Sequence, residues 1–138
     1  MDTTIDMQIM RHLNLFEKVT GVRTNFCFKY NETIFYCIPK PLIPRALGEK
    51  ARNIRRISEI LGRRIRIIPM PEGIEYAKQF VQNIVDPVTF KDLSINEGEI
   101  VLNASSQNKA ALIGRNKRRL LEMQKIIKDF FGKEFRIQ

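Results

Sequence analysis

The stretch "AALIGRNKRRLLEM", residues 110–123, contains two helix-like segments separated by a glycine and a basic run. Residues 110–113 and 120–123 consist mostly of good helix formers. Between them lie Gly114 and four basic side chains at positions 115, 117, 118 and 119. Glycine tolerates backbone conformations that end a helix. The stretch therefore predicts two helices joined by a positively charged turn.

The overall composition favours a globular protein with a polyanionic partner. The chain has 138 residues, of which 43% are hydrophobic and 28% charged, values that are ordinary for a folded domain. Its formal net charge of +9 is less ordinary, because such a field attracts polyanions and raises their encounter rate. Nucleic acid is the leading candidate partner. The first residues include two aspartates and no long apolar run, so we expect a cytoplasmic protein with no membrane partner.

The positive charge is concentrated in two short segments. Residues 45–66 carry a balance of +6 and residues 109–119 a balance of +5, so all other residues together carry −2. These two segments also correspond to each other in sequence. A shift of 66 residues places Gly48 on Gly114 and Arg52 on Arg118.

This correspondence extends over most of the chain. "TIFYCIPKPLIPRALGEKARNIRRI", residues 33–57, aligns with "EIVLNASSQNKAALIGRNKRRLLEM", residues 99–123. "GRRIRI" from Gly62 then aligns with "GKEFRI" from Gly132 after an insertion of four residues, about one helical turn. We therefore predict a tandem repeat with units at residues 1–70 and 71–138, divided at "PMPEG".

Each unit has the same predicted order of elements, which gives an α+β fold class. In the first unit we expect a helix over residues 3–19 with a cap at Asp2 or Thr3, and strands over 22–30 and 33–38 joined at Asn31 and Glu32. A short helix then follows Pro44, a second helix ends at Leu61, and a last strand covers 63–68. In the second unit we expect a helix over 74–84, strands over 88–95 and 99–103, two paired helices, and a strand over 135–137.

This order, length and charge resemble the KH domain in its type II arrangement. The sharpest shared motif is the G-x-x-G turn between paired helices, here "GEKA" from Gly48 and "GRNK" from Gly114. Ala51 and Lys117 replace the second glycine. Two adjoining copies resemble the KH pair of NusA-family transcription elongation and termination factors, and the chain is similar to the short archaeal members. The resemblance implies two tandem type II KH domains, each with a small three-stranded sheet covered by helices.

The resemblance also implies a function. KH domains clamp about four single-stranded nucleotides at this turn, so we expect a non-enzymatic protein that binds nascent single-stranded RNA during transcription elongation and termination. RNA polymerase is a further candidate partner. We expect no cofactor and no metal.

The candidate RNA-binding residues surround the two glycines. The amides of Gly114 and Gly48 are expected to be unpaired and exposed, beside the positive end of a helix dipole. The second unit contributes Gly114, Arg115, Asn116, Lys117 and Arg118, with Ala111, Leu112 and Ile113 as a groove wall. The first unit contributes Gly48, Glu49, Lys50, Ala51, Arg52, Arg55 and Arg56. We expect the second unit to bind better, since Ser105 or Ser106 can cap a fuller helix there, whereas prolines shorten the first.

Two alternatives remain open. Paired helices around a glycine turn also fit a helix-turn-helix reader of duplex DNA, which would use residues 53–59 or 120–124. An accessory subunit of an RNA-processing enzyme is the other alternative, although no catalytic group is evident. The single histidine, His12, is expected to be exposed or to cap a helix, and Cys27 and Cys37 are expected to be buried, reduced thiols.

Overall fold

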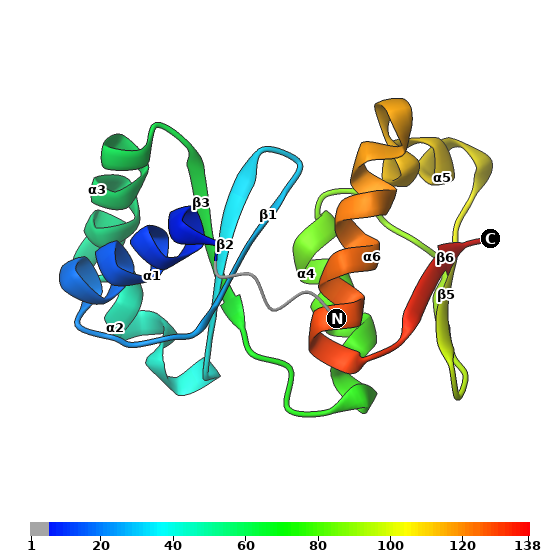
Figure 1. Ribbon diagram of the computed structural model, residues 1–138, viewed down its shortest axis with the longest axis horizontal. Helices are drawn as coiled ribbons and strands as arrows, with labels where there is room; N and C mark the ends of the chain where they lie inside the picture. Colours follow the sequence, from blue (N-terminus) through cyan, green and yellow to red (C-terminus); the bar gives the residue numbers. More distant parts are fainter. Residues whose placement is uncertain (1–5) are drawn as a thin grey trace. The chain divides into compact units, whose positions relative to one another are not determined.

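The computed structural model describes residues 6–138, which form two compact units, one ending at Met70 and the other beginning at Pro71 (Figure 1). Each unit contains three α-helices and a three-stranded sheet, in the order helix, strand, strand, helix, helix, strand. This confirms the α+β class. No helix within residues 6–138 has the length and apolar character needed to cross a membrane.

The first unit forms a mixed sheet of order β1-β2-β3. Its strands are β1 (Phe26–Tyr30), β2 (Thr33–Ile38) and β3 (Arg64–Pro69), and its helices are α1 (Met7–Thr20), α2 (Ile43–Leu47) and α3 (Arg52–Leu61), with single 3₁₀ turns η1 (Lys40–Leu42) and η2 (Glu49–Ala51). Strand β2 pairs with β1 in antiparallel and with β3 in parallel orientation. Asn31 and Glu32 both have positive φ, 49° and 62°, so the β1–β2 turn matches the sheet twist without a glycine.

Helix α1 begins later than its sequence pattern indicates. The Asp6 carboxylate accepts hydrogen bonds from the amides of Gln8 and Ile9 at 2.9 and 3.3 Å, which satisfies two amides of the first turn. The predicted cap at Asp2 or Thr3 lies outside the described residues. The helix ends at Gly21, in the left-handed conformation.

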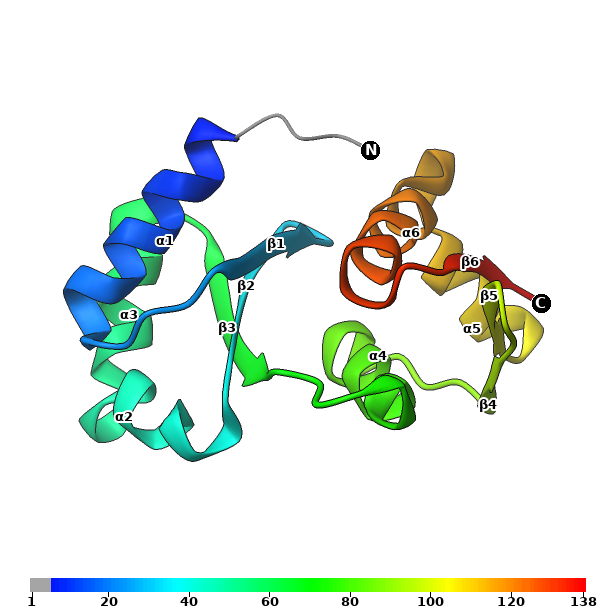
Figure 2. The ribbon, with the colours of Figure 1, turned by 60° about the horizontal axis from the view of Figure 1, so that its bottom comes forward.

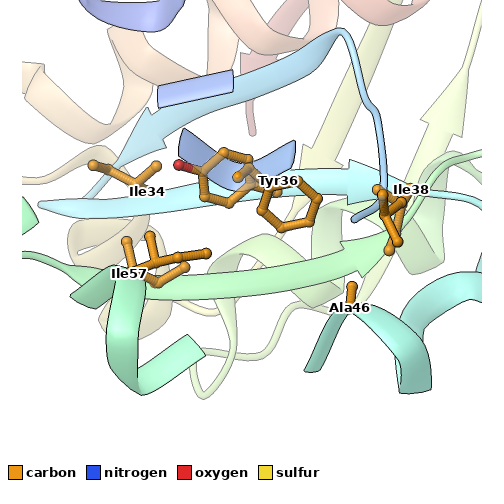
Figure 3. Packing of buried hydrophobic residues seen from close by; sticks show 8 residues of the cluster. Ile34, Tyr36, Ile38, Ala46 and Ile57 are labelled. Carbon is orange, nitrogen blue, oxygen red and sulfur yellow. The ribbon is translucent and has the colours of Figure 1, made fainter. Parts of the chain in front are cut away.

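The core of the first unit fixes the two helices that flank Gly48. Helices α1, α2 and α3 lie on one face of the sheet (Figure 2). Alternate β2 side chains, Ile34, Tyr36 and Ile38, pack with Ala46 of α2 and Ile57 of α3 (Figure 3). Ala46, near the end of α2, and Ile57, in the middle of α3, are fully buried, so both helices are held against the sheet. The turn between them is consequently anchored on both sides.

The second unit repeats this plan with longer paired helices. Its elements are η3 (Ile74–Tyr76), α4 (Ala77–Val85), β4 (Asp92–Ile95), β5 (Glu99–Asn103), α5 (Ser106–Ile113), η4 (Arg115–Lys117), α6 (Arg118–Phe131) and β6 (Glu134–Ile137). The sheet order is β4-β5-β6, again antiparallel and then parallel. Leu112 of α5 and Met123 of α6 are buried and anchor this pair of helices.

The first strand of the second unit is shorter than predicted. The expected strand over residues 88–95 begins only at Asp92. The Val88 amide donates to the Val85 carbonyl at 2.9 Å, and the Asn108 amide group donates to the Thr89 carbonyl at 3.0 Å. The Val88 amide is thus used in a turn and cannot also donate to a neighbouring strand, and Asn108 holds Thr89 in the loop.

The two cysteines are free, and their thiols stay protonated at neutral pH. Cys37 is buried and Cys27 is half-buried. Burial raises the pKa of the Cys27 thiol to about 12 and also raises that of Cys37. Residues 6–138 contain no cluster of three or more histidine, cysteine or acidic side chains arranged to hold a metal ion.

His12 is buried, which contradicts the expected exposed or capping histidine. Only 9% of its surface is exposed, and within residues 6–138 its Nδ1 atom is buried and has no hydrogen-bond partner. The Tyr36 hydroxyl donates to the His12 backbone carbonyl at 3.0 Å. Burial lowers the pKa of the imidazole, Asp6 partly opposes this change, and Arg63 adds to it.

We therefore predict that acid destabilises the protein through His12. The unfolded chain binds a proton near pH 6.5, whereas the folded chain binds it only at lower pH. The free energy of unfolding should be constant above about pH 6.5 and fall as the pH decreases through the folded pKa. Urea denaturation between pH 7.5 and pH 5 measures this on the unaltered chain and on His12→Leu. Equal pH slopes in the two proteins would contradict the prediction, because the chain has no other histidine.

Candidate nucleic-acid interface

The two glycines interrupt the paired helices with the same unusual backbone. Gly48 has φ 76° and ψ 173°, and Gly114 has φ 76° and ψ 171°. This region of φ/ψ space is almost closed to residues that carry a Cβ atom. Each glycine ends one helix and is followed by a single 3₁₀ turn before the next helix begins. The predicted break is therefore present in both units.

Two further residues of each turn are left-handed although they are not glycine. Lys50 and Ala51 have φ 53° and 57°, and Asn116 and Lys117 have φ 57° and 59°. Ala51 and Lys117, which replace the second glycine of the motif, therefore adopt the conformation a glycine would adopt. This conformation costs about 1–2 kcal/mol for a residue with a Cβ atom. Strain at matched positions in two units is typical of functional backbone.

The glycine amides were predicted to be unpaired, but both are paired in the structure. The Gly48 amide donates to the Pro44 carbonyl at 3.1 Å, and the Gly114 amide donates to the Ala110 carbonyl at 3.0 Å. Both glycine amides complete the last turn of the preceding helix, so that prediction was wrong.

The unpaired amides belong instead to the two residues that follow each glycine. These are Glu49 and Lys50 in the first turn and Arg115 and Asn116 in the second. Their backbone N–H groups donate to no acceptor within residues 6–138. All four residues are exposed. Within the same range, no side chain caps the 3₁₀ turns η2 and η4, to which these amides belong, or the helices α3 and α6 that follow. Each turn thus presents uncapped amides to solvent at the positive end of a helix.

Basic side chains surround these amides, more strongly in the second unit. Arg115, Lys117 and Arg118 are all exposed, and residues 114–119 contain no acidic side chain. In the first unit the exposed basic residues are Lys50, Arg52, Arg55 and Arg56. There, Glu49 reduces the positive charge beside the amides. The six residues that begin with the glycine carry a formal charge of +1 in the first unit, residues 48–53, and +4 in the second, residues 114–119. An anionic ligand beside the amides is therefore attracted more strongly to the second turn.

The predicted groove wall is only partly available. Ala111 and Ile113 are half-buried, so each presents some surface beside the turn. Leu112 is buried in the core, with 3% of its surface exposed, and is removed from the candidate set. Its burial follows from helical geometry, because consecutive helix residues point about 100° apart and one must face the sheet.

The helices that enter the two turns differ in length, as was predicted from the prolines of the first unit and the serines of the second. Helix α2 has five residues and follows the 3₁₀ turn η1, whereas α5 has eight residues. Ser105 caps α5 by accepting a hydrogen bond from the Asn108 amide at 3.3 Å. The surface beside the second turn is accordingly longer.

Three side chains contact the turns or span their glycines, and two of them were not among the predicted site residues. Asn53 and Arg119 lie on α3 and α6, each five residues after the glycine, and bond to the preceding helix. Arg55, which was predicted, donates from Nη1 to the Lys50 carbonyl. The alignment of the two units with a shift of 66 residues pairs Asn53 with Arg119. Because one side chain is a neutral amide and the other a charged guanidinium, the sequence alone does not indicate that they have the same role.

Comparison with known proteins identifies archaeal relatives. The chain is 27% identical over 110 residues to the probable transcription termination protein NusA of Methanococcus vannielii, a match that covers 77% of the chain and 61% of that protein. The match takes in less than two thirds of that relative's length. The chain is also 25% identical over 138 residues to the protein of the same name from Halococcus morrhuae, covering 94% and 97% of the two chains. No protein-family model matches the chain.

A solved structure has the same fold. The crystal structure of APE1850 superposes with a TM-score of 0.68 over 97% of this chain and 100% of that one. The two sequences are 23% identical. At this identity the likeness concerns the fold alone.

A side chain at Gly114 should destabilise the second unit. A Cβ atom there would lie 2.9 Å from Arg119 Cγ and 3.2 Å from the Arg119 backbone nitrogen, at a φ of +76°. We predict that Gly114→Ala lowers the free energy of unfolding by about 1–3 kcal/mol, measured by urea denaturation. Gly98→Ala is the matched control, because a Cβ atom there would meet nothing within 4 Å. Equal effects of the two substitutions would contradict the strain at Gly114.

The opposite substitution tests the strain at the second position of the motif. Ala51 has φ 57°, which glycine adopts without cost. We predict that Ala51→Gly raises the free energy of unfolding by up to about 1 kcal/mol, since relief of strain exceeds the added entropy of the unfolded chain. Ala46→Gly, at a fully buried α2 position, should instead destabilise. A loss of stability in Ala51→Gly would show that the turn is not strained there.

Proposed function

We propose that this NusA-like chain of archaeal type binds single-stranded RNA in transcription elongation and termination, without catalytic activity of its own. The observation that carries the proposal is the pair of matched turns, each with uncapped amides at a helix start and exposed basic side chains. The archaeal relatives, named for transcription termination, supply the biological setting. RNA polymerase is a further proposed partner on the same ground.

The turns would bind RNA through its phosphates. Unpaired backbone amides and the positive end of a helix dipole favour a phosphate oxygen without regard to base sequence. In the second unit these are the amides of Arg115 and Asn116, with the side chains of Arg115, Lys117 and Arg118 adding charge. In the first unit the amides of Glu49 and Lys50 would have the same role, supported by Arg52 and Arg56.

The bases would lie against the helix that enters each turn. This arrangement corresponds to type II KH domains, which we propose for both units on the basis of their element order and their glycine turns. Ala111 and Ile113, both half-buried, would form part of the wall in the second unit. Small and apolar side chains leave room for a flat base while excluding water. Two such sites on one chain would bind a single RNA with greater avidity than either alone.

Binding across a salt series tests the proposal. We predict tighter binding to a single-stranded RNA oligonucleotide than to duplex DNA of the same sequence. The logarithm of the affinity should fall with the logarithm of salt concentration with a slope of about −0.7 for each phosphate contacted. Preference for the duplex would support a helix-turn-helix reader instead, and a slope near zero would exclude binding through phosphates.

A charge reversal at the second turn locates the site. We predict that the double variant Arg115→Asp with Asn116→Asp weakens RNA binding by at least about tenfold, because acidic side chains replace the ones beside the free amides. Both positions are exposed, and aspartate tolerates the left-handed conformation of Asn116, so the fold should persist.

The matched control makes the same change of net charge elsewhere in this unit. Lys128 and Asn96 are exposed and lie toward the far end of α6, where Lys128 pairs with Glu134 and Lys133 binds the Asn96 carbonyl. The double variant Lys128→Asp with Asn96→Asp should retain most of the affinity. Equal losses in the two double variants would mean that overall charge, and not the turn, governs binding.

A further inference from the structure

A side chain crosses over the glycine of each turn and joins the two helices that flank it. Asn53 Nδ2 donates to the Ala46 carbonyl at 3.1 Å, and Arg119 Nη1 donates to the Ala111 carbonyl at 3.0 Å. Both donors come from the residue five positions after the glycine, and both side chains are half-buried. We name Asn53 and Arg119 the bracing residues.

The bracing residues occupy the space that the glycines leave open. A Cβ atom on Gly48 would lie 2.8 Å from Asn53 Nδ2, and a Cβ atom on Gly114 would lie 2.9 Å from Arg119 Cγ. Glycine is therefore required at these positions for two reasons. It permits the backbone angles of the turn, and it leaves room for the Asn53 or Arg119 side chain to reach the preceding helix. The acceptor carbonyls belong to the last turn of a helix, where they have no partner within the helix.

The two units meet the same requirement with different chemistry. Asn53 is neutral and Arg119 is charged, yet each donates one hydrogen bond to the preceding helix. Both positions have a side-chain hydrogen-bond donor long enough to reach a carbonyl of the preceding helix. A second side-chain hydrogen bond is made to the first turn, from Arg55 Nη1 to the Lys50 carbonyl. Its counterpart in the second unit is Leu121, an exposed apolar residue that cannot donate such a bond.

We infer that Asn53 and Arg119 are positioning residues that hold each turn in the left-handed conformation that receives RNA. This inference rests on the proposed function. Lys50, Ala51 and Lys117 carry a Cβ atom in a conformation that is unfavourable for them, so the turns would relax if nothing held them. Fixing the distance between the two helices opposes that relaxation. A turn that spends one tenth of its time in the competent conformation binds ten times more weakly.

Arg119 therefore acts through its hydrogen bond and not as a phosphate contact. This sets it apart from Arg115, Lys117 and Arg118, although all four belong to one basic run. Replacement of Arg119 by a neutral donor should preserve RNA binding, whereas replacement by an apolar side chain of similar length should not. Arg119→Asn places at this position the amide group that Asn53 has, with the Leu112 carbonyl as the counterpart of Ala46. Arg119→Met keeps the length and removes the donor.

The experiment combines backbone dynamics with RNA affinity on the full chain. Amide ¹⁵N order parameters of residues 115–117 report the turn without any ligand, and a fluorescently labelled single-stranded RNA of mixed sequence reports binding. In Arg119→Met we expect the order parameters to fall below about 0.6 from about 0.85, and the Kd to rise about tenfold. In Arg119→Asn we expect the order parameters to stay near about 0.85 and the Kd to stay within about twofold of that of the unaltered chain, with an unchanged salt slope.

Asn53→Leu provides a test in which no charge changes. The order parameters of residues 49–51 should fall in this variant while those of residues 115–117 stay constant. Thermal unfolding of each variant shows that the fold is retained, and Asn53→Leu decides the inference should Arg119→Met fail to fold. Unaltered order parameters in folded Arg119→Met or in Asn53→Leu would overturn the inference.

The remaining outcomes separate this inference from the proposed function. Arg119→Asn could bind as weakly as Arg119→Met, with a salt slope smaller by about 0.7. That result would make Arg119 a phosphate contact and overturn its assignment as a positioning residue. Failure of the unaltered chain to bind single-stranded RNA would overturn the proposed function, and with it the part of the inference that concerns RNA. The order parameters would still decide whether the two residues hold the turns.

Discussion

The left-handed backbone after each glycine is the constraint on which the candidate interface depends. It separates two helices by one short turn and leaves the amides of residues 49 and 50, and of 115 and 116, without a partner within the described residues. A helix that began with a capping serine or aspartate would satisfy such amides internally. The residues at the capping positions before these amides are Gly48 and Gly114, which have no side chain, so no side chain caps η2 or η4 within residues 6–138.

Such a backbone persists only where the surrounding structure holds it. Each turn has two residues in a conformation that disfavours a Cβ atom, and each is flanked by helices anchored in a core. Ala46 and Ile57 fix the helices of the first unit, and Leu112 and Met123 fix those of the second. The core therefore contributes to function by fixing the positions between which the turn must close.

The sequence predicted the elements and the location of the turns because these depend on local pattern. Apolar periodicity gave the helices, the glycines gave their ends, and Ser105 was correctly named as a cap candidate. Which amides remain unpaired could not be predicted, since it depends on whether the helix extends to the glycine. The burial of His12 and Leu112 and the reach of Arg119 depend likewise on packing in three dimensions.

The two turns share their backbone far more closely than their side chains. The glycine angles agree within 2° in both φ and ψ, yet Glu49 and Lys50 stand where the second unit has Arg115 and Asn116. What the two turns have in common is therefore their backbone. Backbone amide groups can bind phosphates, which every nucleotide carries. Differences between the units reside in side chains, which under the proposed function would set the strength of RNA binding and the base preference. The higher positive charge of the second turn itself, residues 114–119, and the longer helix that enters it follow this division, and under the proposed function they favour it as the stronger site.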